Sequence, residues 1–242
     1  MRDETKCLHA GYTPKNTEPR VVPIVQSTTY VYDSTEDVAA VFGETLANPA
    51  LTVLDIERFA NIAHRHTVPL IVDNTFATPV LCKPFEYGAD IIVHSTSKYM
   101  DGHAVQIGGA IVDSGKFDWT CGKFPGLTEP DESYHGISYK DTYGKRAYIV
   151  KARMQLMRDF GVYPAAHSAF LLNLGLETLA VRMKQYCENA LAVARYLEKS
   201  GYVEHVNYPG LESDEDYSLA KKYLKGCSGV ISFVIKGGKE NA

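Results

Sequence analysis

Apolar side chains recur at helical spacing directly after Asp55. The positions i, i+3, i+4 and i+7 of one helix face are occupied by Ile56, Phe59, Ala60 and Ala63. Such spacing is typical of an amphipathic helix, and an aspartate before its first residue can cap the N-terminus. The pattern predicts a surface helix that packs on a sheet.

Three short apolar runs follow this helix, at residues 68–72, 91–93 and 109–112. They are rich in β-branched residues and bounded by turn residues, as strands buried on both faces usually are. A helix that alternates with such strands indicates an α/β fold. We therefore expect a mostly parallel sheet with helices on both faces.

A second periodic region lies further on, where one helical face stays apolar from Met183 to Leu197. Ser200 and Gly201 then supply a helix stop. Strand patterns at residues 202–208 and 230–235 enclose a helical pattern at residues 217–224, which suggests a second, α+β unit.

These patterns divide the chain into three regions. Residues 1–43 are expected to form an N-terminal arm, mostly irregular, with a short helical signal at residues 34–42. Residues 44–170 would hold the sheet. Residues 171–242 would hold the long helix and the start of an incomplete C-terminal α+β domain.

Composition narrows the possible functions. The 242 residues are 45% hydrophobic and 22% charged, and 25 basic against 29 acidic residues give a formal charge of −4. The basic residues are scattered, so neither nucleic acid nor a membrane surface is expected as a partner. The N-terminus leads into no apolar leader segment and the apolar runs are too short to span a membrane. We expect a cytoplasmic protein.

The cysteines do not form a recognisable metal or disulfide pattern. Five of them lie far apart, at Cys7, Cys82, Cys121, Cys187 and Cys227. None is in a Cys-x-x-Cys motif, and none alternates with histidine at metal-ligand spacing. We expect free thiols and no metal site.

Polar side chains follow two of the predicted strands where each strand ends. Asp73 closes the first run, and a segment with Ser95, Ser97 and Lys98 follows the second. Open α/β sheets bind ligands at the carboxyl ends of their strands. Alone, Asp73 could be a turn or capping residue and Lys98 a solvated surface residue, but the two strand ends together offer complementary groups.

This combination fits pyridoxal 5'-phosphate (PLP). A protein that uses PLP needs a lysine amine that binds it covalently, a carboxylate for the ring nitrogen and donors for the phosphate. Lys98 would supply the amine and Asp73 the carboxylate. Ser95 and Ser97 would donate hydroxyls to the phosphate.

The same segments carry a family resemblance. Residues 72–79 (VDNTFATP) and 88–99 (GADIIVHSTSKY) resemble the signature of the Cys/Met-metabolism PLP-dependent enzymes. The motif positions of that family fall on the residues already singled out, Asp73, Ser95, Ser97 and Lys98. The resemblance implies a PLP-dependent transferase fold of type I, similar to that of aspartate aminotransferase, with residues 44–170 as the PLP-binding domain.

A further motif is similar to the family pattern. Residues 44–49 (ETLANP) look like the strand-end motif whose asparagine bonds the ring hydroxyl, which implies a cofactor-binding role for Asn48. Without the resemblance, Asn-Pro would simply be a turn.

Within the family, the resemblance is closest to the O-acetylhomoserine sulfhydrylases. It rests on residues 8–11, 23–30, 115–119, 124–136 and 175–183. It implies γ-replacement on O-acetyl-L-homoserine with sulfide or a thiol, giving homocysteine and acetate in methionine biosynthesis, by a homo-oligomer (dimer or tetramer). A methionine or cystathionine γ-lyase and a catalytically inactive fragment remain alternatives.

Two parts of the family pattern are missing from this sequence. Between Gly43 and Glu44, family members have a long segment with a Tyr-x-Arg and a glycine-containing loop for the phosphate, and a tyrosine that stacks on the ring. Beyond Ala242 they have an arginine for the substrate carboxylate. Two hydroxyls cannot offset the desolvation of a phosphate dianion, so we expect an open phosphate side and no bound PLP if these residues are the whole chain.

Overall fold

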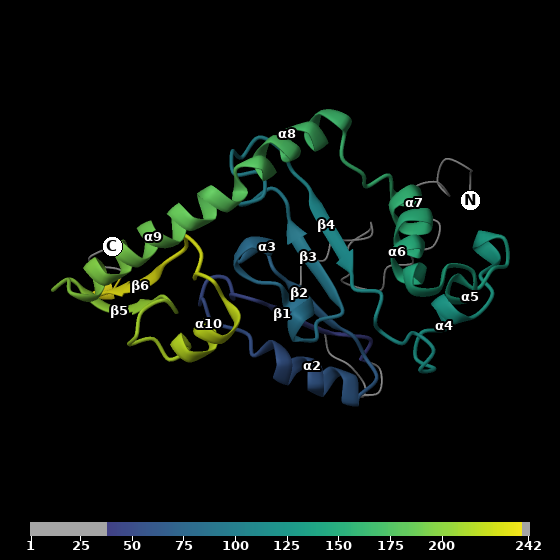
Figure 1. Cartoon of the computed structure of the whole chain (residues 1–242), viewed down its shortest axis with the longest axis horizontal. Coiled ribbons are helices and arrows are strands. Elements are labelled where there is room, and N and C mark those ends of the chain that lie inside the picture. The colour runs from purple at the N-terminus through teal and green to yellow at the C-terminus, as the bar shows by residue number, and fades with distance from the viewer. Residues whose placement is uncertain (1–37, 239–242) are drawn as a thin grey trace, which may run out of the picture. The chain divides into compact units, whose positions relative to one another are not determined.

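The computed structural model describes residues 38–238, and residues 39–238 lie in one compact unit, Ala39–Ala242. The resemblance at residues 8–11 and 23–30, and most of the expected arm, lie outside the described residues. Figure 1 shows the elements of this unit. Its division into regions at residues 43 and 170 stays a prediction.

A four-stranded sheet forms the centre of the unit. Its strands are β1 (Val41–Glu44), β2 (Leu70–Asp73), β3 (Ile91–Ser95) and β4 (Gly109–Asp113), in the spatial order β1-β2-β3-β4. The first three run parallel, with Glu44 opposite Asp73 and Asp73 opposite Val93. The expected mostly parallel α/β sheet is confirmed, and three strands end at the same edge.

Two details of the sheet differ from the sequence expectations. The helical signal at residues 34–42 is wrong where the structure describes it, because Val41 and Phe42 pair with β2 as strand residues. β4 is antiparallel to β3, and Ile111 and Val112 on it are exposed rather than buried on both faces. β-branched residues favour a strand, but they do not determine its direction or whether its faces are covered.

Helix α2 (Ile56–Arg65) forms where the apolar spacing predicts it. Asp55 caps it by accepting a hydrogen bond from the Arg58 amide (3.4 Å), and Ile56, Ala60 and Ala63 are buried. Phe59, expected on the same face, is 39% exposed. The cap is also a tertiary contact, since the hydroxyl of Tyr223 in helix α10 (Tyr217–Tyr223) donates to Asp55 Oδ1.

Short helices follow β2 and β4. After them come two longer helices that run end to end (Figure 1). The short ones include α3 (Thr78–Leu81), α4 (Pro125–Thr128), α5 (Tyr139–Tyr143), α6 (Ala147–Lys151) and α7 (Arg158–Phe160), with a π-helical turn at Ala152–Met157 and 3-10 turns at Pro84–Tyr87, Glu132–Tyr134 and Gly144–Arg146. The longer ones are α8 (Ala166–Glu177) and α9 (Leu179–Glu198).

The predicted long helix and second α+β unit are also observed. α9 contains the periodic region that begins at Met183, and it ends just before Ser200. Beyond it, β5 (Val203–Asn207) pairs antiparallel with β6 (Ser232–Ile235), and α10 (Tyr217–Tyr223) lies between them in sequence. Among residues 38–238, no helix combines the length and apolar character needed to cross a membrane.

The buried apolar residues form two clusters. The larger joins the sheet to α2, α9 and α10, and includes Ile56, Val72, Met183 and Tyr223. The smaller is largely aromatic and is built from Ile91, Trp119, Leu127, Tyr134, Tyr139 and Ala147. In it the Trp119 ring stacks on Tyr148, with the ring centroids 5.2 Å apart and the planes 4° from parallel.

Candidate functional site

The carboxyl ends of β1 and β2 are joined by a buried hydrogen bond. Thr45 Oγ1, one residue beyond β1, donates to Asn74 Oδ1 at 2.8 Å. Asn74 Nδ2 in turn donates to the carbonyls of Thr78 and Cys82, each at 3.1 Å. Both side chains are almost completely buried, so this network fixes the strand ends and the start of α3.

The ends of β2 and β3 are joined through Thr75. Asp73 Oδ1 accepts from the Thr75 amide, and Thr75 Oγ1 accepts from the Ser95 amide, both at 2.8 Å. The structure thus brings Asp73 and Ser95 together, as the sequence predicts. Asp73 Oδ2 makes no hydrogen bond with any residue that the structure describes, so one carboxylate oxygen is available.

Thr75 is a site residue that the sequence argument missed. It lies within the motif at residues 72–79, but its link to Ser95 spans 20 residues of sequence. The only local signal is the spacing Asp-x-Thr, which favours an Asx turn.

Lys98 lies in a tight turn after β3. Its amide donates to the Ser95 carbonyl (3.3 Å), and its own carbonyl accepts from the Gly102 amide (2.8 Å). The side chain is exposed, and its Nζ has no hydrogen bond or ion pair within residues 38–238. It lines a cavity of about 530 Å³, together with Phe76, Ser97, Tyr99, Gly102, His103, Ala104, Tyr186 and Val230.

The two predicted serines differ in their surroundings. Ser97 Oγ accepts from the Gly108 amide (2.9 Å), lies 3.4 Å from the Gly108 carbonyl and also lines the cavity beside Lys98. The Ser95 hydroxyl has no partner in the described part of the chain, and Ser95 does not line that cavity.

Asn48 lies in the turn that follows β1. Leu46 and Val53 form the bridge that closes this turn, and the Asn48–Pro49 peptide bond is cis. The Asn48 amide donates to Glu44 Oε2 at 2.7 Å, while its side chain is exposed. Asn48 is not among the residues that line the cavity beside Lys98.

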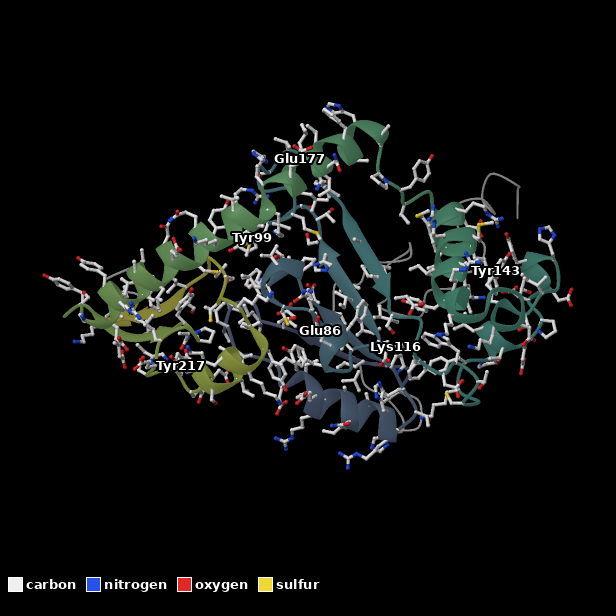
Figure 2. All side chains as sticks on the ribbon, in the orientation of Figure 1. Glu86, Tyr99, Lys116, Tyr143, Glu177 and Tyr217 are labelled. Carbon is white, nitrogen blue, oxygen red and sulfur yellow. The ribbon has the colours of Figure 1, made fainter. Side chains whose placement is uncertain are left out.

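Tyr99 anchors the turn that carries Lys98. Its ring lies against Phe76 and Tyr186, with centroid distances of 6.5 and 5.4 Å. Its hydroxyl accepts from the Gly229 amide at 3.1 Å. Burial raises the pKa of this hydroxyl, so Tyr99 acts as a neutral anchor. Figure 2 shows Tyr99 beside the ribbon of α9.

A buried histidine stands directly before Ser95. His94 is 5% exposed, and its Nδ1 has no partner among the described residues. Burial lowers the pKa of the imidazole, while the nearby Asp73 carboxylate and the Asn74 backbone act in the opposite direction. No role for His94 is predicted from the sequence.

The sequence of this chain matches known proteins over most of its length. Residues 34–242 match the family of Cys/Met metabolism PLP-dependent enzymes. The chain is 48% identical over 205 residues to a homocysteine/cysteine synthase of Saccharomyces cerevisiae, and 44% identical over 219 residues to an O-acetyl-L-homoserine sulfhydrylase of Leptospira meyeri. These matches cover 83% and 86% of this chain, but 46% and 50% of the two relatives.

A solved structure agrees with the sequence matches. The chain is similar to a putative O-acetylhomoserine (thiol)-lyase from Campylobacter jejuni with a TM-score of 0.81 and 37% identity. The match covers 84% of this chain and 51% of that one, whose structure contains a lysine that carries pyridoxyl 5'-monophosphate. The chain thus spans about half the length of the proteins it resembles.

Proposed function

Because the chain belongs to the Cys/Met metabolism PLP-dependent enzyme family, we propose that it is a PLP-dependent enzyme for γ-replacement. The substrates are O-acetyl-L-homoserine and sulfide or a thiol, and the products are homocysteine and acetate, in methionine biosynthesis. The names of the two relatives support this choice. The observation that carries it is the linked strand ends, where Asp73 Oδ2 and Lys98 Nζ have no partner among residues 38–238.

The described side chains fit the reactive end of PLP. Within the described part of the chain, Lys98 Nζ has no partner beside a cavity of about 530 Å³, and Asp73 Oδ2 has none at the adjacent strand end. An amine and a carboxylate are the groups that the aldehyde and the ring nitrogen require. The hydroxyls of Ser95 and Ser97 would donate to the phosphate. The side-chain amide of Asn48 would form a hydrogen bond with the ring hydroxyl.

Lys98 and Asp73 have different tasks in the proposed reaction. Bound PLP supplies an electron sink next to the amino group of the substrate. Lys98 would hold the cofactor covalently, and once released by the substrate amine its neutral Nζ would remove the proton from the substrate α-carbon. The Asp73 carboxylate keeps a proton on the ring nitrogen by pairing with it. Loss of a β-proton would then supply the electron pair that expels acetate from the γ-carbon as a β,γ double bond forms. Sulfide would add at the γ-carbon, and protons would return to the β- and α-carbons.

We also propose that the chain works as a homo-oligomer in the cytoplasm. α8 has apolar residues all round, yet Phe170, Leu174 and Leu176 are exposed, as is Ile111 on β4. A helix of that composition is normally buried, and a second copy of this chain is the occupant that we propose. Free thiols at the described cysteines favour a reducing compartment. A single species of 26.8 kDa in sedimentation analysis would refute the oligomer.

The cofactor assignment is tested by chemical capture. The chain is incubated with PLP, reduced with borohydride and mapped by peptide mass spectrometry. Borohydride reduces the imine to a stable amine, so it also captures PLP that is held only weakly because the phosphate side is open. We expect the label on Lys98, its loss in Lys98→Ala, and its retention in the control Lys116→Ala, since Lys116 is exposed and lies outside the cavity. A label that persists elsewhere in Lys98→Ala would contradict the assignment.

The reaction is tested by comparing substrates. Homocysteine formation from O-acetyl-L-homoserine and sulfide is measured beside breakdown of methionine and of cystathionine. The proposal requires the first to be the fastest. Faster release of an oxo acid from methionine or cystathionine would instead assign a γ-lyase.

A further inference from the structure

The turn that follows Lys98 is bound by a guanidinium from a distant helix. Arg182 lies in the first turn of α9, and its Nη1 donates to the Tyr99 carbonyl at 2.8 Å. Its Nη2 donates to the Gly175 carbonyl at 2.6 Å and lies 3.5 Å from the Met100 carbonyl. Its Nε donates to Thr178 Oγ1 at 3.0 Å. A planar fork with all three nitrogens engaged has a fixed orientation.

The partners of this arginine are unusual for a surface cation. Arg182 forms no ion pair with any carboxylate in the described part of the chain, and three of its four acceptors are backbone carbonyls. Hydrogen bonds from a charged donor are stronger than those from a neutral one. Arg182 therefore joins its own helix to a backbone segment 83 residues earlier, at Tyr99, rather than neutralising an acid.

Two glycines allow the close approach on which this contact depends. A Cβ at Gly175 would lie 2.3 Å from the Asp101 carbonyl oxygen and 2.6 Å from that of Met100. A Cβ at Gly102 would lie 2.2 Å from Arg182 Nη1, and Gly102 has a φ of +73°. The end of α8 and the turn after Lys98 thus meet backbone to backbone, with no space for the turn to shift toward α8.

We propose that Arg182 is a positioning residue for Lys98. By holding the carbonyls of Tyr99 and Met100, it fixes the turn whose other side is bonded to Ser95, and so presents the Lys98 amine at the strand ends. The inference rests on the proposed role of Lys98 and adds a residue to it. A lysine cannot replace Arg182, because one ammonium cannot reach acceptors on both segments with the same fixed geometry.

Amide exchange tests this without any cofactor. The amides of Asp101 and Gly102 bond the carbonyls of Thr96 and Lys98, so their exchange rates report the order of the turn. In Arg182→Ala and Arg182→Lys we expect both amides to exchange at least about tenfold faster, the factor that corresponds to about 1.4 kcal/mol. The exchange rates of the β2 amides should be the same as in the wild type. The control Arg195→Ala, which removes an exposed arginine of the same helix, should leave the exchange rates of Asp101 and Gly102 unchanged.

Capture of PLP at Lys98 provides the second readout. We expect the rate of borohydride-fixed labelling to fall about tenfold in both variants. Ethylguanidinium should restore the rate in Arg182→Ala. It should not restore the rate in Arg182→Lys, because the lysine side chain still fills the space. Wild-type exchange and labelling in either folded variant would overturn the proposal. If Arg182→Ala does not fold, Arg182→Lys decides. If the wild-type chain captures no PLP, the proposed function fails, while the exchange measurement still decides the positioning role.

Discussion

Asp90 provides a test that separates stability from the candidate site. It precedes β3, at the end opposite to Ser95, and it is 4% exposed. Its Oδ2 accepts from the Leu70 amide at 2.8 Å and lies 2.7 Å from His64 Nε2. We expect Asp90→Ala to destabilise the fold while leaving the capture of PLP at Lys98 intact.

The magnitude follows from these two contacts. Removing the acceptor leaves the buried Leu70 amide without a partner, which costs about 1–3 kcal/mol. The contact with His64 adds little, at most about 1 kcal/mol, because that imidazole is 42% exposed and screened by solvent. The total is about 1–4 kcal/mol. Asp90→Asn retains an oxygen that can accept from Leu70, so its cost should be about 1 kcal/mol.

Urea unfolding followed by far-ultraviolet circular dichroism measures these differences. The midpoint should fall in the order wild type, Asp90→Asn, Asp90→Ala, with the same dependence on urea. His64→Ala is the matched control, since it removes only the exposed partner and should change stability least. An Asp90→Ala midpoint equal to that of the wild type, or a loss of Lys98 labelling in the folded variant, would refute the reasoning.

Three further expectations concern individual groups. Asp73→Asn should leave the urea midpoint nearly unchanged but slow PLP labelling of Lys98 and abolish activity, because the amide cannot hold a proton on the ring nitrogen; equal losses in Asp73→Asn and Asp90→Asn would contradict this. Because burial lowers the pKa of His94, this imidazole binds a proton more readily in the unfolded chain, so stability should fall as the pH drops below about 6.5. The decline should be smaller in His94→Gln. Titration of the His94 imidazole by nuclear magnetic resonance should give a midpoint below 6.5. Burial raises the pKa of Cys82 to about 12, so peptide mapping after iodoacetamide treatment should find Cys121 alkylated well before Cys82.

Local patterns were sufficient to predict α2 and α9 from helical spacing, and β2 and β3 from short β-branched runs. Each of these elements buries apolar residues in one of the two clusters, so its pattern is visible in the sequence. β1 was not predictable in this way, because Val41 and Phe42 form a strand only when Leu70 and Ile71 are available beside them. Pairing between distant segments, rather than local preference, decides that element.

The candidate site shows the same division. Asp73, Ser95 and Lys98 could be selected because each stands at or just after a strand end with suitable chemistry. Thr75 and Arg182 could not, since their roles consist of hydrogen bonds to residues 20 and 83 positions away. The neutral, buried state of His94 likewise depends on what covers it.

The stacked Trp119 gives this chain a built-in optical probe of one region. It is the only tryptophan in the sequence, it is 3% exposed, and its indole Nε1 has no partner within residues 38–238. An indole shielded from water in this way emits at shorter wavelength than a solvated one. Because Trp119 is packed with Phe117, Phe124 and Tyr148, a red shift of its emission reports opening of the aromatic cluster. The unfolding transitions followed by fluorescence and by circular dichroism would therefore differ if the aromatic cluster and the larger core unfold in different steps.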